Sequence, residues 1–151
     1  NDVSNLKIIA AQPHGCSPIV DAFKSNSNEI FPVEKPDTIA KSLAIGDPGD
    51  GIYVLKRLKQ YHGIAESATN QEIIDGILKL SKTEGIFTEP AGGVSVAVLQ
   101  KLVEDGKIDR DANIVCYVTG NGLKSTEAIV GMLPKPSTVK PDVQMVSTII
   151  R

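Results

Sequence analysis

Three glycine-rich segments are the places where this sequence could bring its backbone close to a ligand. They are Ile45–Gly51, Glu89–Gly93 and Thr119–Gly122. Glycine allows close approach, and Gly92 with Gly93 at a predicted helix start could present backbone amides to an anion or a planar ring. The same residues also suit tight turns between strands and helices, so their spacing leaves both interpretations open. No G-x-G-x-x-G or G-x-x-x-x-G-K-S/T pattern occurs in the sequence, so the familiar nucleotide-binding motifs are not supported.

The histidines and cysteines form no arrangement typical of a metal site or an activated nucleophile. His14 follows a predicted strand and could touch a ligand, whereas His62 lies at a predicted helix end, where interaction with the helix dipole is the simpler interpretation. Cys16 and Cys116 lie 100 positions apart without a C-x-x-C pair, so neither a disulfide scaffold nor a zinc knuckle is indicated. We predict two buried thiols and no metal site.

Composition argues against a nucleic-acid or anionic-membrane binder. Sixteen basic residues against eighteen acidic residues give a net charge of −2, whereas such binders need a basic surface. Three Phe, three Tyr and no Trp leave little for base stacking. The longest apolar run, Ile114–Val118, has five residues and falls far short of the roughly 20 that span a bilayer. We therefore expect a cytoplasmic protein with no nucleic-acid or membrane partner.

Alternating apolar runs and turn residues predict the elements that must position the glycine-rich segments. Strands are expected at Leu6–Ala11, Ile64–Ala68 and Asn113–Thr119, the last being the strongest strand pattern in the chain. Helices are expected from Pro18 to before Ser25, over Ile52–Tyr61, from a capping box at Thr69–Glu72 to Gly85, and over Ala91–Glu104. An extended loop is expected at Glu29–Asp37, and Thr38–Ala44 is ambiguous between a short helix and a strand.

This alternation favours an α/β fold with a mainly parallel sheet flanked by helices in three layers. In such sheets ligands bind at the carboxyl ends of the strands, and the three glycine-rich segments fall in loops of that kind. The 151 residues fit one domain or one lobe of a larger one. Because the sequence begins at Asn1 without an initiator Met, we expect it to be a piece of a longer protein.

Four short segments carry a family resemblance. They read QPHGCSP from Gln12, TIA from Thr38 followed by AIGDP from Ala44, TEGIFTEPAGG from Thr83, and TGNGLK from Thr119. In this order and spacing they resemble the C-terminal part of the threonine synthase family, pyridoxal-phosphate enzymes with a tryptophan-synthase-β-like fold. The resemblance covers about residues 6–125. The Glu-Pro-Ala-Gly segment is shared with related dehydratases, whereas AIGDP and TGNGLK are more specific to threonine synthases.

The resemblance implies a reaction and three cofactor-binding residues. The reaction converts O-phospho-L-homoserine and water to L-threonine and phosphate, with pyridoxal 5'-phosphate as the electron sink. The Thr119 hydroxyl would hydrogen-bond the pyridine nitrogen, Gly46 would line the ring, and Glu89 would border the pocket. The resemblance further implies that residues 1–125 are the C-terminal part of the catalytic region. Residues 126–151, rich in proline before Val143–Ile150, would form a C-terminal arm or terminal strand.

The resemblance also implies that the active site is incomplete in these 151 residues. In the family, the Schiff-base lysine and the glycine-rich phosphate loop lie in the N-terminal part, outside this sequence. Phe23-Lys24-Ser25 only mimics the lysine motif, because it lies on a predicted helix where we expect Lys24 to face solvent. We therefore assign no catalytic residue and expect this chain alone to be inactive. The expected partners are the N-terminal part of the same enzyme and an amino-acid phosphate substrate. A homodimer is one assembly that we expect of the complete enzyme.

Three positions depart from the family pattern and keep alternatives open. They are His14, Asp47 and Ser125, where the family often has an acidic residue, Asn and Asp, respectively. A related pyridoxal-phosphate-dependent amino-acid dehydratase or a cysteate-synthase-like enzyme is therefore an alternative function. A non-catalytic module for ligand binding or assembly, which would reuse this half of the fold without chemistry, is the alternative from another class.

Overall fold

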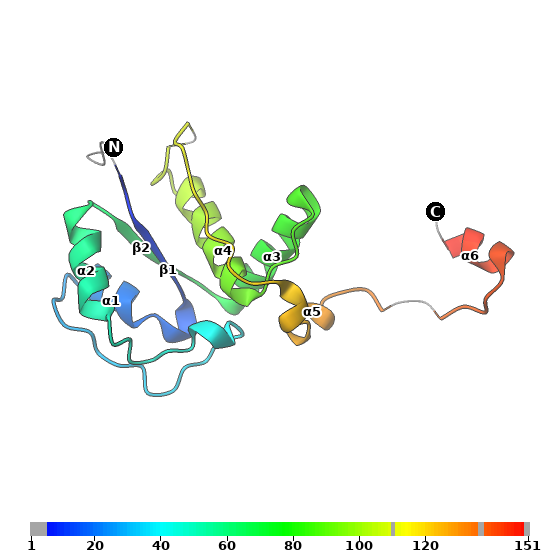
Figure 1. Ribbon diagram of the computed structural model, residues 1–151, viewed down its shortest axis with the longest axis horizontal. Coiled ribbons are helices and arrows are strands. Elements are labelled where there is room, and N and C mark those ends of the chain that lie inside the picture. Colours follow the sequence, from blue (N-terminus) through cyan, green and yellow to red (C-terminus); the bar gives the residue numbers. More distant parts are fainter. Residues whose placement is uncertain (1–5, 110, 136–137, 150–151) are drawn as a thin grey trace.

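A two-stranded parallel sheet organises the chain. The computed structural model describes residues 6–109, 111–135 and 138–149 (Figure 1). Strand β1 (Ile9–Pro13) pairs with β2 (Ile64–Ala68), so that Ile9 lies opposite Ile64 and Pro13 opposite Ala68. Helices pack against both faces of this sheet and form three layers. The predicted fold class, a parallel sheet flanked by helices, is confirmed.

One face of the sheet packs against the helices that connect the two strands. These are α1 (Pro18–Lys24) and α2 (Gly51–Gln60). Because side chains alternate along a strand, Ala10 and Ala65 both project to this face. The apolar cluster here contains Val20, Leu58 and Ala65, with Ile8, Ala10, Ile19, Phe23 and Val54 packed around them. The helices thus cover the sheet in the usual way for a parallel crossover.

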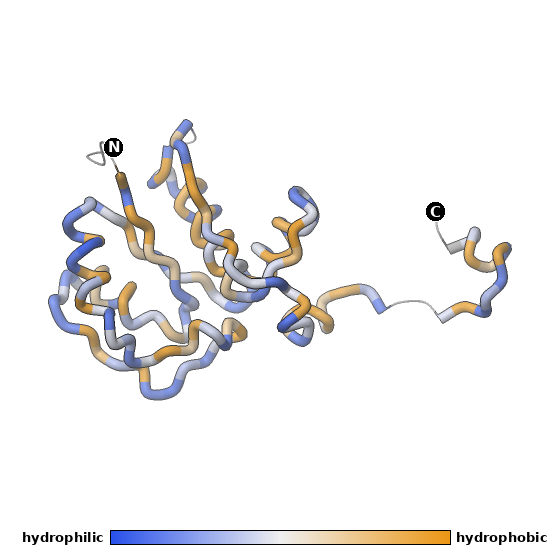
Figure 2. Tube along the Cα trace, in the orientation of Figure 1, coloured by the Kyte–Doolittle hydropathy of each residue, from blue (hydrophilic) through white to orange (hydrophobic). Residues whose placement is uncertain are grey.

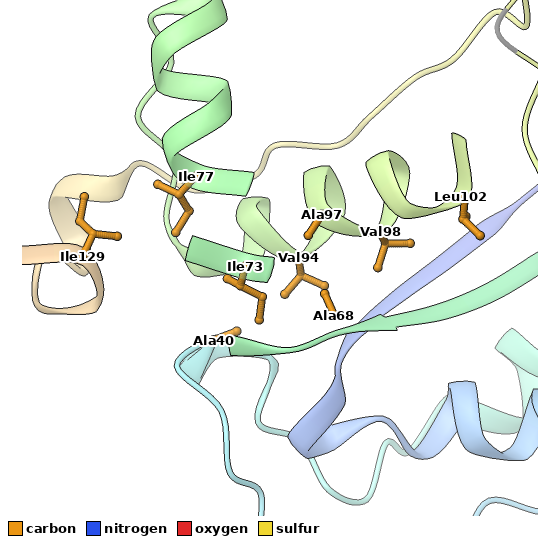
Figure 3. Packing of buried hydrophobic residues seen from close by; sticks show 9 residues of the cluster. All are labelled: Ala40, Ala68, Ile73, Ile77, Val94, Ala97, Val98, Leu102 and Ile129. Carbon is orange, nitrogen blue, oxygen red and sulfur yellow. The ribbon is translucent and has the colours of Figure 1, made fainter. Parts of the chain in front are cut away.

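The opposite face packs against α3 (Asn70–Glu84) and α4 (Pro90–Glu104), as Figure 3 shows. The cluster comprises Ala40, Ala68, Ile73, Ile77, Val94, Ala97, Val98, Leu102 and Ile129. Two helix-interior glycines lie where α3 meets α4. A Cβ on Gly93 would lie 2.8 Å from the Ile73 carbonyl oxygen, and one on Gly76 would lie 2.8 Å from the Gly93 oxygen. Glycine therefore lets these two helices approach more closely than alanine would.

Side-chain caps define where two of the helices begin. At the start of α3, the Glu72 N–H donates to the Thr69 hydroxyl and the Thr69 N–H donates to the Glu72 carboxylate, which confirms the predicted capping box. At the start of α1, the N–H groups of Ile19 and Val20 both donate to Gln12 Oε1 at 3.0 Å. Gln12 lies on β1, so its amide joins the strand to the helix that follows it.

Most predicted elements are confirmed, with shifts at their ends. Strand β1 begins three residues later than the predicted strand Leu6–Ala11 and continues to Pro13, because pairing with β2 sets its limits. Helix α3 ends before Gly85, whose φ of 67° is the left-handed conformation that glycine adopts readily. Within the ambiguous stretch, Lys41–Leu43 forms a single 3-10 turn, η2. The loop expected at Glu29–Asp37 contains neither helix nor strand.

The strand predicted at Asn113–Thr119 is wrong for this structure. The segment runs alongside α4 as a continuous apolar stretch, visible in Figure 2, but it belongs to no sheet. Backbone groups of residues 113–119 make no hydrogen bond to any described part of the chain. The apolar, β-branched pattern is typical of a strand, but a strand forms only when a neighbouring strand accepts and donates its hydrogen bonds.

The C-terminal region contains two short helices, α5 (Glu127–Val130) and α6 (Val143–Ile149). A terminal strand was one expectation for residues 126–151, and the structure instead has a helix over Val143–Ile149. The Asp142 carboxylate accepts hydrogen bonds from the N–H groups of Gln144 and Met145, so it caps this helix. The division of the chain at residue 125 stays a prediction. No helix in the described ranges combines the length and apolar character needed to cross a membrane.

Candidate functional site

Two of the three glycine-rich segments meet at the amino end of α4. An isolated antiparallel bridge joins Thr88 to Asn121. The Glu89 N–H donates to the Gly120 carbonyl at 3.0 Å, and the Thr88 hydroxyl donates to the same oxygen at 3.0 Å. Near this end of α4, Val94 packs with Ala68, the last residue of β2 (Figure 3). The site therefore lies by the carboxyl end of the sheet, where α/β proteins bind ligands.

Glu89 is a buried carboxylate held by a single cation. Its side chain is 11% exposed, and Oε2 lies 3.3 Å from the Nζ of Lys124, whose side chain is 65% exposed. A Cβ on Gly120 would lie only 1.8 Å from Glu89 Oε1, so the carboxylate occupies the space that a side chain at position 120 would need. Burying a charge is unfavourable without a partner, and Lys124 supplies one. Glu89 is thus positioned directly against the Thr119–Gly122 segment.

Thr119 lies next to Gly120 and is exposed. Among the described residues, its hydroxyl has neither a donor nor an acceptor partner. An exposed hydroxyl without such a partner is available to donate a hydrogen bond to a ligand atom. The structure therefore brings the predicted residues Thr119 and Glu89 into one neighbourhood, separated by a single glycine.

Gly46 has a different neighbourhood. Its carbonyl accepts a hydrogen bond from the Val33 N–H at 3.0 Å, and a Cβ at position 46 would lie 2.0 Å from the Val33 carbonyl oxygen. The nearest atoms to that position belong to Val33 and Pro36, not to Glu89 or Thr119. Loop packing explains the glycine here, and its role in lining a cofactor ring stays a prediction.

Packing also explains Gly92 and Gly93. A Cβ on Gly92 would lie 2.0 Å from the Thr88 hydroxyl oxygen, and the corresponding position on Gly93 is filled by Ile73 and Ile77 of α3. Both glycines are buried against protein atoms. Of the two interpretations that spacing left open, the structure favours close packing at this helix start over direct approach to a ligand.

Other contacts of the site have weak signals in the sequence. Thr88 and Lys124 both lie inside segments that carry the family resemblance. The structure adds their long-range contacts, since the Thr88 hydroxyl donates to the Gly120 carbonyl and Lys124 pairs with Glu89. Hydrogen bonds also join the start of α3 to the loop that contains Thr38. The Ile39 N–H donates to Asn70 Oδ1 at 3.1 Å, and the Thr38 hydroxyl donates to the same oxygen at 3.4 Å. This link fixes the Thr38 loop against the start of α3.

The remaining reactive side chains lie outside the Glu89 neighbourhood. His14 is exposed after β1, and its contact with a ligand stays a prediction, whereas His62 lies at the end of α2 with a φ of 45°. Cys16 is fully buried as expected, but Cys116 is only partly buried. Burial raises the pKa of both thiols. In the described part of the chain, no three His, Cys, Asp or Glu side chains gather as a metal site would require.

The prediction for Lys24 needs correction. Its side chain is half-exposed, but it does not simply face solvent, because its ammonium group pairs with the buried carboxylate of Glu66 on β2. Burial would raise the pKa of Glu66, but hydrogen bonds from the Lys24 ammonium and the Ser67 N–H, with the positive charges of Lys24 and Lys101, lower that pKa overall. Lys24 therefore has a structural partner.

Comparison with known proteins identifies related sequences. A family model described as "Pyridoxal-phosphate dependent enzyme" matches residues 2–120. The threonine synthase of Methanocaldococcus jannaschii is 38% identical over 145 residues, a match covering 96% of this chain and 36% of that protein. The threonine synthase of Methanosarcina acetivorans is 37% identical over 140 residues, covering 93% of this chain and 35% of that protein. The chain thus spans about a third of the length of the curated relatives it matches.

Solved structures show the same fold. The processed form of threonine deaminase isoform 2 from Solanum lycopersicum superposes with a TM-score of 0.68 at 20% identity, covering 85% of this chain and 36% of that chain. Maize serine racemase gives a TM-score of 0.64 at 17% identity, covering 84% and 40%, respectively. At these identities the likeness shows the fold alone, and it confirms the tryptophan-synthase-β-like class expected from the sequence.

Proposed function

Because the chain belongs to the pyridoxal-phosphate-dependent enzyme family, we propose that it is the C-terminal part of a threonine synthase, a lyase. The full enzyme would convert O-phospho-L-homoserine and water to L-threonine and phosphate. The observation that supports this most is the 38% identity with a threonine synthase over 96% of the chain. A cytoplasmic location and a homodimer stay predictions.

The chemistry of Thr119 fits the family's cofactor. A neutral hydroxyl can donate a hydrogen bond to the pyridine nitrogen without holding that nitrogen protonated, and the Thr119 hydroxyl is exposed and free of described partners. When bound, the cofactor supplies the electron sink that allows phosphate to leave and water to add. In this proposal Glu89, held by Lys124, orients the Gly120 backbone and so keeps Thr119 in place, while Gly46 borders the ring.

We further propose that this chain does not act alone. In the proposed enzyme, the lysine that binds the cofactor and the loop that binds its phosphate lie in the N-terminal part. Lys124 is engaged with Glu89, and Lys24 is engaged with Glu66, so neither is a free amine near Thr119. About two thirds of the length of the related threonine synthases lies outside the match, which leaves room for both elements.

An amino-acid dehydratase with the same cofactor is the second candidate. It is favoured by the Glu-Pro-Ala-Gly segment, which such enzymes share, and by the departures from the threonine synthase pattern at His14, Asp47 and Ser125. The two candidates differ in their products. A threonine synthase releases inorganic phosphate from O-phospho-L-homoserine, whereas a dehydratase releases ammonia from a hydroxyamino acid.

The test is to express the complete reading frame that contains this sequence and to assay both reactions with added pyridoxal phosphate. We expect phosphate and threonine in equal amounts from the complete enzyme. Ammonia from serine or threonine without threonine synthesis would favour the dehydratase, and no turnover with tight ligand binding would favour the non-catalytic module.

A substitution in the complete enzyme tests the role of Thr119. We expect Thr119→Asp to lower threonine formation much more than cofactor binding, because a carboxylate would favour a protonated pyridine nitrogen. The matched control is Thr148→Asp in α6, an exposed threonine far along the chain from the site, which should leave both properties unchanged. Turnover that is equal in the two variants would remove Thr119 from the site.

A further inference from the structure

We propose that Thr88 is a positioning residue for Thr119 and acts on it through the backbone of Gly120. The Thr88 hydroxyl donates to the Gly120 carbonyl at 3.0 Å, and Gly120 directly follows Thr119 in the chain. The reason to position Thr119 rests on the proposed function, in which its hydroxyl meets the cofactor. The contact that positions it rests on hydrogen bonds and packing within this chain.

Gly120 is the first fixed point after a stretch of backbone that has none in this chain. Residues 113–119 make no backbone hydrogen bond to any described part of the chain, whereas the Gly120 carbonyl accepts two hydrogen bonds. One comes from the Glu89 N–H and the other from the Thr88 hydroxyl, both at 3.0 Å. Glycine has no side chain to restrict its backbone angles, so these two bonds must fix the orientation of its peptide group. The direction of Thr119 therefore depends on them.

The Thr88 hydroxyl is committed to this contact. Thr88 is 1% exposed, so water does not compete for its hydrogen. Its oxygen also lies 3.3 Å from the Glu89 carbonyl, but that carbonyl already accepts from the Gly93 N–H at 3.1 Å within α4. A hydroxyl carries a single hydrogen, and the shorter contact to Gly120 takes it.

Gly92 leaves the space that this hydroxyl occupies. A Cβ on Gly92 would lie 2.0 Å from Thr88 Oγ1 and 3.0 Å from Thr88 Cβ. A larger residue at position 92 would therefore push the hydroxyl away from the Gly120 carbonyl. Glycine is less favourable than alanine in a helix, so its presence in the first turn of α4 indicates that this space matters more than helix propensity.

A double-mutant cycle in the complete enzyme tests the positioning role. Thr88→Val removes the hydroxyl and keeps the side-chain shape, and Thr119→Val removes the hydroxyl that is positioned. We expect Thr88→Val to lower kcat at least about threefold, as the loss of one hydrogen bond does. In the Thr119→Val background the further loss should be less than about twofold, because no hydroxyl is left to position. A smaller loss from Thr88→Val alone, or an equal loss in both backgrounds, would overturn the proposal.

The cycle does not depend on which reaction the complete enzyme catalyses. It is read from threonine formation or from ammonia release, whichever occurs. If the complete enzyme shows no turnover, it is read from the dissociation constant of pyridoxal phosphate, with the same two outcomes. A failure of the proposed threonine synthase activity is thereby distinguished from a failure of the role of Thr88.

Hydrogen exchange of the complete enzyme, prepared without cofactor, tests the contact itself. The Gly122 N–H donates to the Phe87 carbonyl at 3.0 Å beside the Thr88 contact, so it reports on opening of this loop. We expect the peptide covering residues 120–124 to exchange at least about threefold faster in Thr88→Val than in the unchanged protein. A smaller change would show that the hydroxyl does not fix the loop, and would overturn the proposal.

Two control variants separate the hydroxyl from general effects of substitution. Thr88→Ser keeps the hydroxyl and should retain kcat within about twofold of the unchanged enzyme. A loss as large as that of Thr88→Val would contradict the proposal, because shape and not the hydroxyl would then matter. Thr83→Val removes an exposed hydroxyl that donates to the Lys79 carbonyl at 3.1 Å in α3, and should leave kcat and exchange at residues 120–124 unchanged. If Thr88→Val does not fold, Thr88→Ala replaces it, since the smaller side chain makes no new contact with Gly120.

Discussion

Replacing Gly93 by alanine tests how closely α3 and α4 must approach. Helix propensity alone predicts a more stable protein, since alanine is favoured over glycine by about 1 kcal/mol in a helix interior. The structure predicts the opposite, because the added Cβ would lie 2.7 Å from Ile77 Cγ1 and 2.8 Å from the Ile73 carbonyl oxygen. The Ile77 side chain can move, but the carbonyl belongs to the α3 backbone. Reaching van der Waals contact near 3.5 Å requires the helices to separate by about 0.7 Å.

This separation of α3 from α4 determines how much the Gly93→Ala variant is destabilised. Overpacking a well-packed core typically destabilises a protein by about 1–3 kcal/mol. We expect the upper part of this range, because Ile73 and Val94 beside the contact are fully buried and the obstacle is backbone. Subtracting about 1 kcal/mol of helix propensity leaves a net destabilisation of about 1–2 kcal/mol. Helix α4 also carries Glu89 at its start, so the same shift should disturb the contact between Glu89 and Gly120.

Urea unfolding followed by circular dichroism measures the difference. The control is Gly131→Ala, where a Cβ meets nothing within 4 Å and φ is −70°, so its stability should be unchanged or raised by up to about 1 kcal/mol. Adding Gly76→Ala to Gly93→Ala should destabilise by less than the sum of the single variants, because one separation of the helices relieves both contacts. A Gly93→Ala protein as stable as the Gly131→Ala control would refute the close-approach reasoning.

Three further outcomes follow from the same contacts. Because the pKa of Glu66 is lowered in the folded protein, its contribution to stability is present above the unfolded-state value of about 4.3 and is lost as pH falls through the folded value. In acid titrations of unfolding free energy, Glu66→Gln should therefore lose less stability over that window, and an unchanged acid dependence would contradict the Lys24 contact. Gly85→Ala should destabilise by about 1 kcal/mol in thermal melts, since φ is 67°, and neutrality would argue against that C-cap. Iodoacetamide should alkylate Cys116 before Cys16 in this chain, because Cys16 is fully buried, and the reverse order would contradict the packing around α1.

Elements with local signals could be predicted from the sequence. Pro18 at the first helical position, the Thr69 capping box and the left-handed Gly85 are each specified within a few residues, and each lies where the pattern predicts. The ends of β1 are set instead by its distant partner Ile64–Ala68, so they differ from the apolar run. The Asn113–Thr119 pattern predicts an extended, apolar segment correctly, but a sheet needs hydrogen bonds from a second strand, which no local pattern contains.

The candidate site also has features that the sequence could predict and features that depend on long-range contacts. Thr119 and Glu89 could be named from short segments, and the Thr88–Asn121 bridge brings those segments together. The pairing of Glu89 with Lys124 depends on a contact 35 residues apart, which spacing alone does not specify. Likewise, a glutamate on β2 suggests an exposed position, yet Glu66 is buried because lysines from α1 and α4 converge on it. Gly46 is the opposite case, because the sequence suggested a contact with a cofactor. In the structure, close packing against the Val33 carbonyl is enough to explain why this position is glycine.

The Gln12 side chain closes a position that many α/β proteins use for anions. The free N–H groups in the first turn of a helix that follows a parallel strand commonly form a binding site for a phosphate group. Here the N–H groups of Ile19 and Val20 already donate to the neutral amide oxygen of Gln12. The Gln12 side chain therefore connects β1 to α1 and occupies the N–H groups that would otherwise bind an anion. In any enzyme that contains this chain, a phosphate group must therefore bind somewhere other than the start of α1.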